Sequence, residues 1–258
     1  MSLISSNTLF HFTNNADTIL NIIRNGFHPK FCLEELSVGS FLGNEDSKEE
    51  ALPMTCFCDL PLSQIKTHLD FYGSYGVGLS KEWGKRSGLT PITYINIEST
   101  KFKVLKEISN KLDVYSHSTE NQGSDISSHP LALLSELVSQ HKPYEGKMWR
   151  NGKYVSKRFY DEREWRYVPR IVSPNLDYRL SKKEFLSGIK KSTADASLET
   201  DYRLQFNASD VKYLIVKTAD EMIDLFDGID TMNEVYNEKE MKVLKTKIIS
   251  TVQIIEDF

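Results

Sequence analysis

The chain has 258 residues, of which 40% are hydrophobic, and a net charge of −4 from 32 basic and 36 acidic side chains. This composition excludes a largely disordered protein, and the near-balance of charge gives no support for nucleic-acid or membrane binding over the whole surface. With three cysteines, no leader and no apolar run of about 18 residues, we expect one soluble, cytoplasmic domain over residues 1–258, with neither disulfides nor a membrane span.

The first half of the chain is predicted to contain short strands and short helices. Residues 9–12 form a strand in which Phe10 and Phe12 share one face and His11 points to the other. A helix follows and ends at Gly26, since glycine commonly ends helices. The other expected elements are a loop at 44–50, a buried strand within 53–62, a helix at 63–71, a tightly packed strand at 76–79, a helical turn at 80–85 and a strand at 91–97.

The second half adds strands and helices without a repeating strand–helix–strand unit. Residues 164–168 alternate, so that Trp165 and Tyr167 face one way while Glu164 and Arg166 face the other. The remaining expected elements are an amphipathic helix at 131–141, a buried strand at 211–216, a helix at 219–226 and a closing strand at 246–255. This irregular order predicts an α+β fold.

The usual cofactor and metal signatures are absent from the chain. The glycine-rich stretch after Tyr72 does not form the dinucleotide-binding pattern G-x-G-x-x-G, and there is no Walker A loop, nucleophile elbow or H-E-x-x-H motif. Cys56 and Cys58, with Cys32 and His68, are residue types found in zinc sites. Their one-residue spacing, however, places both sulfurs on one strand face, unlike a zinc knuckle. We therefore interpret the cysteines as small buried side chains.

Three segments carry side chains that suit a pocket for a polar ligand with a flat ring. These side chains are His11 and Thr13, then Tyr72 and Tyr75, then Glu162 and Glu164. The two carboxylates point the same way if both lie in one strand. A carboxylate can hold a ribose hydroxyl and stabilise an oxocarbenium-like transition state, an aromatic ring can stack on nicotinamide, and a histidine can fix a second hydroxyl. The alternative is a core histidine, close packing and a surface charge cluster.

A basic stretch surrounds the two glutamates. Residues 147–170 hold eight basic and three acidic side chains, with aromatic residues between them. This composition is typical of a surface that contacts phosphates or nucleic acid, although a solvated loop has it too. Under the first interpretation, the contacting residues are Lys153, Lys157 and Arg158.

Five motifs together resemble the AbiGi family of bacterial abortive-infection proteins, which act in phage defence. They are L-F-H-F-T from residue 9, N-G-F-H-P from residue 25, P-M-T-C-F-C-D-L-P-L-S from residue 53, Y-G-S-Y-G-V-G-L from residue 72 and E-x-E-W-R-Y-V-P from residue 162. The resemblance runs from about residue 8 to about residue 255. It implies the antitoxin-like member of a two-gene system, with a cognate toxin or antitoxin protein as partner.

A second resemblance concerns the order of the chemical groups. Histidine on the first strand, tyrosine in the middle and glutamate on a late strand are similar to the His-Tyr-Glu ADP-ribosyltransferases, and the opening H-F-T is similar to their DarT type. This resemblance implies a split sheet with flanking helices and NAD as a substrate. His11 and Thr13 would then bind NAD, Tyr72 or Tyr75 would stack on nicotinamide, and Glu164 would be catalytic beside Glu162.

The residues and the resemblances lead to two hypotheses for the function, and both describe a phage-defence protein. The first is an NAD-dependent ADP-ribosyltransferase that acts on nucleic acid or protein, with the strands at 9–12, 54–58, 76–79 and 164–168 close together. The alternative is a non-catalytic antitoxin that neutralises a partner by direct binding. A third possibility is a nucleic-acid-binding module that uses residues 147–170.

Overall fold

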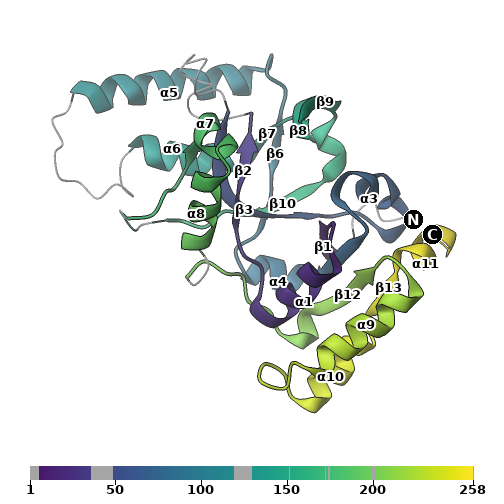
Figure 1. Cartoon of the computed structure of the whole chain (residues 1–258). Coiled ribbons are helices and arrows are strands. Elements are labelled where there is room, and N and C mark those ends of the chain that lie inside the picture. Colours follow the sequence, from purple (N-terminus) through teal and green to yellow (C-terminus); the bar gives the residue numbers. More distant parts are fainter. Residues whose placement is uncertain are drawn as a thin grey trace.

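A computed structural model describes residues 6–35, 49–118, 130–150, 152–171, 173, 175–198 and 201–257. These residues form a mixed sheet with helices on its flanks (Figure 1), which confirms the predicted α+β class. Most of the loop expected at 44–50 lies outside the described residues.

The central sheet has nine strands within the described part of the chain. Its main order is β13 (Ile248–Ser250), β12 (Val211–Val216), β4 (Tyr75–Ser80), β1 (Thr8–Thr13), β3 (Glu50–Cys58), β10 (Glu164–Tyr167) and β5 (Thr90–Pro91). Two further strands, β2 (Lys30–Glu34) and β11 (Leu180–Ser181), also pair with β3. The four strands expected to lie close together are therefore direct neighbours, in the order β4, β1, β3 and β10.

The sheet opens between β1 and β3. These two strands pair only at Phe10 and Cys58, whereas β1 stays paired with β4 from Thr8 to Thr13. Beyond the single pair, the backbone carbonyl of Cys56 accepts a hydrogen bond of 2.8 Å from Nδ1 of His11. A side chain thus takes the place of a strand partner, because the two backbones have separated.

Close packing of β1 on β4 explains the glycines of the Y-G-S-Y-G-V-G-L motif. A methyl group on Gly78 would lie 2.8 Å from the ring of Phe10, and one on Gly76 would lie 2.9 Å from the ring of Phe12. Real side-chain carbons avoid such distances, so both positions need glycine. The prediction of a strand pressed against a neighbour is confirmed.

The helix α1 (Ala16–Asn25) begins and ends as its sequence predicts. The side chain of Asn15 accepts a hydrogen bond from the backbone N–H of Asp17, and Gly26 follows the helix with φ of 80°. Its buried face packs into the largest apolar core, together with the aromatic rings of Phe27, Phe57 and Trp83. This packing fixes the segment that leads from α1 into β2.

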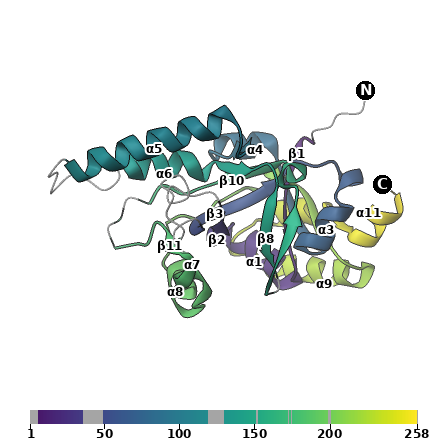
Figure 2. The ribbon, with the colours of Figure 1, turned by 90° about the horizontal axis from the view of Figure 1, so that it is seen from above.

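Two pairs of helices lie at opposite ends of the sheet (Figures 1 and 2), with α5 (Thr100–Ser118) and α6 (Pro130–Ser139) at one end and α9 (Ala219–Asp230) and α11 (Thr251–Asp257) at the other. The other elements are η2 (Leu62–Gln64), α3 (Lys66–Tyr72), α4 (Lys81–Arg86), β6 (Thr93–Ile95), β7 (His141–Pro143), β8 (Gly146–Arg150), β9 (Lys153–Lys157), η4 (Phe159–Glu162), α7 (Lys182–Leu186), α8 (Ile189–Ser197), η5 (Ala208–Asp210) and α10 (Glu238–Lys245).

Three sequence predictions were wrong in their local structure. The strand expected at 91–97 is two short strands, β5 and β6, which pair with different neighbours. The closing strand expected at 246–255 ends at Ser250 and becomes α11, because Ser250 and Gln253 form reciprocal hydrogen bonds that start a helix. Glu162 is not in the strand with Glu164 but in the turn η4, from which Arg163 leads with φ of 47°.

Candidate functional site

A cavity of about 740 Å³ lies where β1 and β3 separate. Its volume is within the range of about 300–1,000 Å³ that is usual for sites of small molecules and cofactors. The predicted site residues that line it are His11, Thr13, Tyr72, Glu162 and Glu164. The structure therefore brings five of the six predicted catalytic and cofactor-binding residues together.

The sixth residue, Tyr75, is not among those that line the cavity. Its hydroxyl donates a hydrogen bond of 2.8 Å to Glu221, at the start of α9. Of the two tyrosines left open by the sequence, only Tyr72 can contribute to a site in this cavity.

Glu162 and Glu164 converge although only one of them is in a strand. Nζ of Lys142, from β7, donates hydrogen bonds of 3.0 Å to Oε2 of Glu162 and 2.9 Å to Oε2 of Glu164. All three side chains are nearly buried. The expected pair of neighbouring carboxylates is thus present, but a lysine that the sequence analysis did not identify stands between them.

Arg166 extends this group on the other side of Glu164. Its Nε donates to Oε1 of Glu164 at 2.5 Å, and its Nη2 donates to Oε2 of Glu34, in β2, at 2.8 Å. The Arg166 side chain has no exposed surface, and its Nη1 donates to the backbone carbonyl of Ser139. We call these residues, together with Lys157, which pairs with Glu162, the carboxylate cluster; its members are Glu34, Lys142, Lys157, Glu162, Glu164 and Arg166.

Ion pairing keeps Glu162 and Glu164 ionised. Burial acts to raise the pKa of Glu164, but Arg166 and Lys142 outweigh it and hold the pKa well below its usual range. Burial likewise opposes ionisation of Glu162, whose pKa is lowered by Lys142 and further by Lys157. Burial on its own would lower the pKa of Lys142, yet the surrounding carboxylates raise it well above the usual value.

Tyr72 and Lys157 complete the surroundings of Glu162. The hydroxyl of Tyr72 donates a hydrogen bond to Oε1 of Glu162, and Nζ of Lys157 lies 2.6 Å from the same oxygen. Nζ of Lys157 also lies 4.4 Å from the centre of the Tyr72 ring, and the His68 ring lies 4.5 Å from it. A nicotinamide stacked on Tyr72 would have to displace one of these two neighbours.

The opposite end of the cavity carries His11. Because a backbone carbonyl only accepts hydrogen bonds, Nδ1 of His11 carries the proton and Nε2 of the neutral ring is an acceptor. Burial lowers the pKa of His11, so the ring is neutral at pH 7. The rings of Phe27 and Phe57 lie 5.3 Å and 5.6 Å from it.

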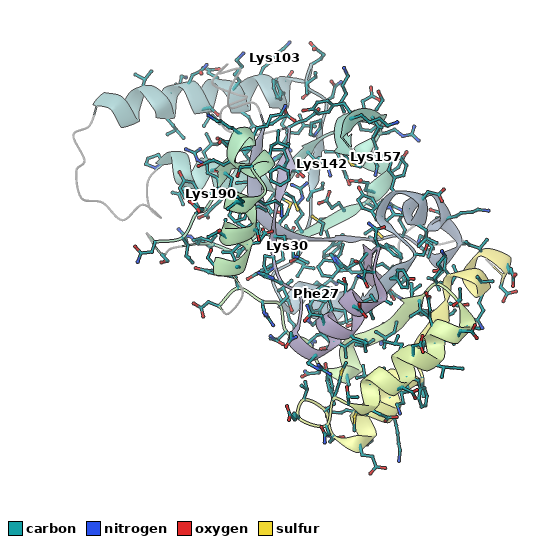
Figure 3. The ribbon with its side chains drawn as sticks, viewed as in Figure 1. Phe27, Lys30, Lys103, Lys142, Lys157 and Lys190 are labelled. Carbon is teal, nitrogen blue, oxygen red and sulfur yellow. The ribbon has the colours of Figure 1, made fainter. Side chains whose placement is uncertain are left out.

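His28 and Lys30 follow Phe27 along the same rim. We call His11, Phe27, His28 and Lys30 the histidine end of the cavity. Nε2 of His28 is within 2.8 Å of the backbone carbonyl of Asp195. Within the described part of the chain, no side chain forms an ion pair with the exposed ammonium of Lys30. Figure 3 shows Lys30 close to Phe27, with Lys142 and Lys157 above them in that view.

The strand register places His11 and Glu164 on opposite faces of the sheet. Glu164 pairs with Cys58, and Cys58 pairs with Phe10, so these three side chains share a face that His11 does not. The cavity nevertheless reaches both residues because the sheet is open between β1 and β3. A ligand that contacts both would pass through the opening rather than lie on one face.

The three cysteines lie close to the cluster as thiols. Burial raises the pKa of Cys32 to about 11 and holds those of Cys56 and Cys58 well above the usual value. The Cys56 thiol contributes to the lowered pKa of Glu164. Among the residues with described positions, no group of three or more His, Cys, Asp and Glu side chains is arranged to hold a metal ion.

The predicted phosphate-contacting residues separate into two groups. Lys153 and Arg158 are exposed, and Arg158 pairs with the exposed Asp161. Lys157 instead points inward, with 10% of its side chain exposed, and its ammonium lies beside Glu162 and Tyr72. Arg166, also part of the basic stretch, is fully buried. The stretch is therefore not one basic surface.

The sequence analysis missed Glu34 and Lys142 as members of the site. One signal was available for the lysine: Glu162, Glu164 and Arg166 were expected to point the same way from one strand, which gives that face more negative than positive charge. Buried carboxylates need cations. Nothing in the sequence indicated which lysine would supply the charge, since Lys142 lies in the three-residue strand β7.

The finished site can bind a ligand with both anionic and hydroxyl groups. The carboxylate cluster offers ionised acceptors at one end of the cavity, and the histidine end offers a neutral ring acceptor and a cation at the other. Such a site suits a nucleotide that bears ribose hydroxyls and phosphates.

Comparison with known proteins gives one family. The family model described as "Putative abortive phage resistance protein AbiGi, antitoxin" matches residues 25–217. The protein "Abortive phage resistance protein AbiGi" of Lactococcus lactis subsp. cremoris is 31% identical over 191 residues, which cover 67% of this chain and 74% of that protein. No solved structure matches. None of the helices with described positions is long and apolar enough to cross a membrane.

Proposed function

Because the chain belongs to the AbiGi family of abortive phage resistance proteins, we propose that it acts in phage defence by binding NAD in the cavity and transferring ADP-ribose to an acceptor. One observation carries this proposal. His11, Tyr72 and the pair Glu162 and Glu164 come from three separate segments of the chain and line one cavity at an opening in the sheet. Their order along the chain is the order that led us to expect an ADP-ribosyltransferase.

In the proposed reaction, the bond between the ribose C1′ and the nicotinamide nitrogen breaks. Nicotinamide leaves with the electron pair, an oxygen or nitrogen of the acceptor bonds to C1′, and the acceptor's proton is released. Positive charge develops on the ribose as the bond breaks. The ionised Glu164 stabilises that charge and accepts a hydrogen bond from a ribose hydroxyl.

The other residues bind and orient. Nε2 of His11 accepts a hydrogen bond from a hydroxyl of the second ribose, and Thr13 lies beside it at the end of β1. Tyr72 lines the nicotinamide end and is oriented by its hydrogen bond to Glu162. Glu162 already meets Tyr72, Lys142 and Lys157, so its main effect is to position these groups and it is less available to an acceptor.

The test is incubation with NAD labelled in the ADP-ribose part, together with bacterial nucleic acid and protein. We expect label on an acceptor and release of nicotinamide. Glu164→Gln should still bind NAD and should lose transfer by about 10²–10³-fold, the scale for one missing electrostatic stabiliser. Glu162→Gln should lose less, and His11→Ala should weaken binding more than it slows transfer.

Because Glu164 is buried between two cations, Glu164→Gln will also lower stability. Assays therefore belong at a temperature where the variant is folded, as judged by circular dichroism. Glu107→Gln is the matched control, since this exposed glutamate pairs only with Lys111 on α5 in the described structure. A folded Glu164→Gln variant with full phage protection would remove the catalytic proposal.

A second function, neutralisation of a toxin by direct contact, is supported by the word antitoxin in the family description. Apolar side chains are exposed one helical turn apart on two packed helices: Val104 and Ile108 on α5, and Leu133 and Leu137 on α6. Under this function, Ile108→Glu with Leu137→Glu should abolish neutralisation of a co-expressed toxin and leave NAD binding unchanged. Retained neutralisation would exclude this surface.

A further inference from the structure

One ammonium group holds two carboxylates from different elements. Nζ of Lys142 is 3.0 Å from Glu162, in η4, and 2.9 Å from Glu164, in β10. Its side chain is 11% exposed, and the Phe159 ring lies 4.7 Å away on another side. Only a cation that donates more than one hydrogen bond can satisfy both carboxylates from this position.

The short strands β6 and β7 fix where this ammonium lies. Lys142 pairs with Tyr94 in the parallel register of these strands. The hydroxyl of Tyr94 in turn accepts a hydrogen bond of 2.9 Å from the backbone N–H of Glu164. One pair of strands therefore positions both the lysine and one of its carboxylates, which makes the distance between them a property of the fold.

The charges of the cluster balance only when Lys142 is present. Glu34, Glu162 and Glu164 face Lys142, Arg166 and Lys157. Without the lysine, three buried carboxylates share two cations. Neighbouring buried carboxylates cannot both stay ionised without such compensation, so the pair would take up a proton.

We propose that Lys142 is a positioning residue that holds Glu162 and Glu164 side by side as two anions, so that Glu164 is ionised when positive charge develops on a bound ribose. The ligand in this statement rests on the proposed function. The pairing itself rests on the geometry of the cluster. The titratable and charged groups among the described residues that face Lys142 or its two carboxylates are Glu34, Arg166, Lys157, His68, Tyr72, Tyr94, Cys32, Cys56 and Cys58.

The test removes the charge of Lys142 and keeps the size of its side chain. Lys142→Met has an unbranched side chain of similar length without the ammonium. We would follow the glutamate side-chain carboxyl carbons by ¹³C NMR while the pH is varied, and measure NAD turnover over the same range. Lys111→Met is the matched control, because Lys111 pairs with an exposed glutamate.

We expect one carboxyl group of Lys142→Met, absent from the wild type and from Lys111→Met, to titrate at a raised pH. Turnover should then fall about tenfold for each pH unit below that titration, as for loss of a single essential ionised group. The double variant Lys142→Met with Glu162→Gln restores the balance of charge. It should lose the extra titration and melt at a higher temperature than Lys142→Met.

The double variant also keeps the test decisive if Lys142→Met alone does not fold. A folded double variant that retains the extra titration would contradict the pairing, as would a folded Lys142→Met variant without it. An extra titration with an unchanged turnover profile would overturn the positioning role. If wild type turns over no NAD, the proposed function fails, and the carboxyl titration alone decides whether Lys142 holds the pair.

Discussion

The carboxylate cluster and the histidine end belong to one cavity but satisfy their polar groups differently. In the cluster, each carboxylate meets cations from the same chain, and the buried charges balance. At the histidine end, one ring nitrogen of His11 is bound by the backbone, while Lys30 has no ion-pair partner among the described residues. The cluster therefore holds its side chains in fixed positions, whereas the histidine end leaves the ammonium of Lys30 available to pair with an anionic ligand.

This difference has a physical reason. A balanced group of buried charges costs desolvation energy, which hydrophobic side chains of the same volume would avoid. Buried groups of charges are typical of functional sites, where the charges act on a ligand or on a reaction. The cluster thus supplies fixed electrostatic groups to the cavity, whereas affinity for a ligand depends more on the histidine end, where Lys30 has no ion-pair partner among the described residues.

The largest expected effect comes from removing a cation of the cluster. Arg166→Met leaves Glu34 and Glu164 buried without their shared partner, and we expect a loss of about 3–5 kcal/mol in the free energy of unfolding. Urea unfolding measures it. Arg158→Met is the control, because its pair with Asp161 is more than half exposed and contributes about 0–1 kcal/mol. Equal losses in the two variants would contradict the difference between buried and exposed pairs.

The next effect concerns pH, through His68 beside Tyr72. Burial lowers the pKa of His68 from 6.5 to about 4. Between these pH values the unfolded chain binds a proton that the folded chain does not. The free energy of unfolding is therefore highest above pH 6.5 and falls as the pH is lowered towards 4. His68→Phe keeps the ring contacts with Phe12 and Tyr72 and should make the fall shallower.

Thermal unfolding between pH 4 and 8 would measure this difference between His68→Phe and the wild type. The fall will not vanish in the variant, because burial also lowers the pKa values of His11 and His141. An equally steep fall in both proteins would show that His68 is protonated in the folded chain. The cluster end would then be more open to water than its burial indicates.

The cavity illustrates what the sequence could and could not predict. Alternation in β10 correctly placed Glu164 and Arg166 on one face, because residue spacing in a strand fixes direction. It did not place Glu162, because the left-handed conformation of Arg163 separates the turn from the strand. Arginine gives no local signal for that conformation, which tertiary contacts impose.

Contacts between residues that are far apart in the chain could not be predicted from the sequence either. Glu34 meets Arg166 across 132 positions of the chain, and Lys142 reaches Glu162 from a strand of three residues. The wrong closing strand had a local cause instead. Ser250 and Gln253 form a capping box that the β-branched residues around them concealed, so that element could have been predicted.

A smaller effect should follow from changing the histidine end. Lys30→Met removes a cation that has no ion-pair partner among the described residues, and it should weaken NAD binding about 10–100-fold, since a charge-assisted bond to phosphate contributes about 1.5–3 kcal/mol. Binding of nicotinamide riboside, which lacks phosphates, should not change. Calorimetric titration of both ligands measures this. Lys103→Met, on α5 and not among the residues that line the cavity, is the control. Equal weakening for both ligands would place the phosphates elsewhere.

The smallest effect concerns the basic stretch. Lys153 and Arg158 are the two exposed residues of the predicted phosphate-contacting group, so Lys153→Ala with Arg158→Ala should weaken binding of a single-stranded oligonucleotide only a few-fold. The dependence of this binding on salt should also become shallower, by about 0.7 in log–log slope for each phosphate that the variant no longer neutralises. Neither of these two substitutions should affect the melting temperature.

Lys157→Ala should have the opposite pattern, because its ammonium lies beside the buried Glu162. It should lower the melting temperature and leave the salt dependence unchanged. A salt slope that responds to Lys157→Ala and not to the exposed pair would mean that the inward lysine, rather than the outer surface, meets the nucleic acid.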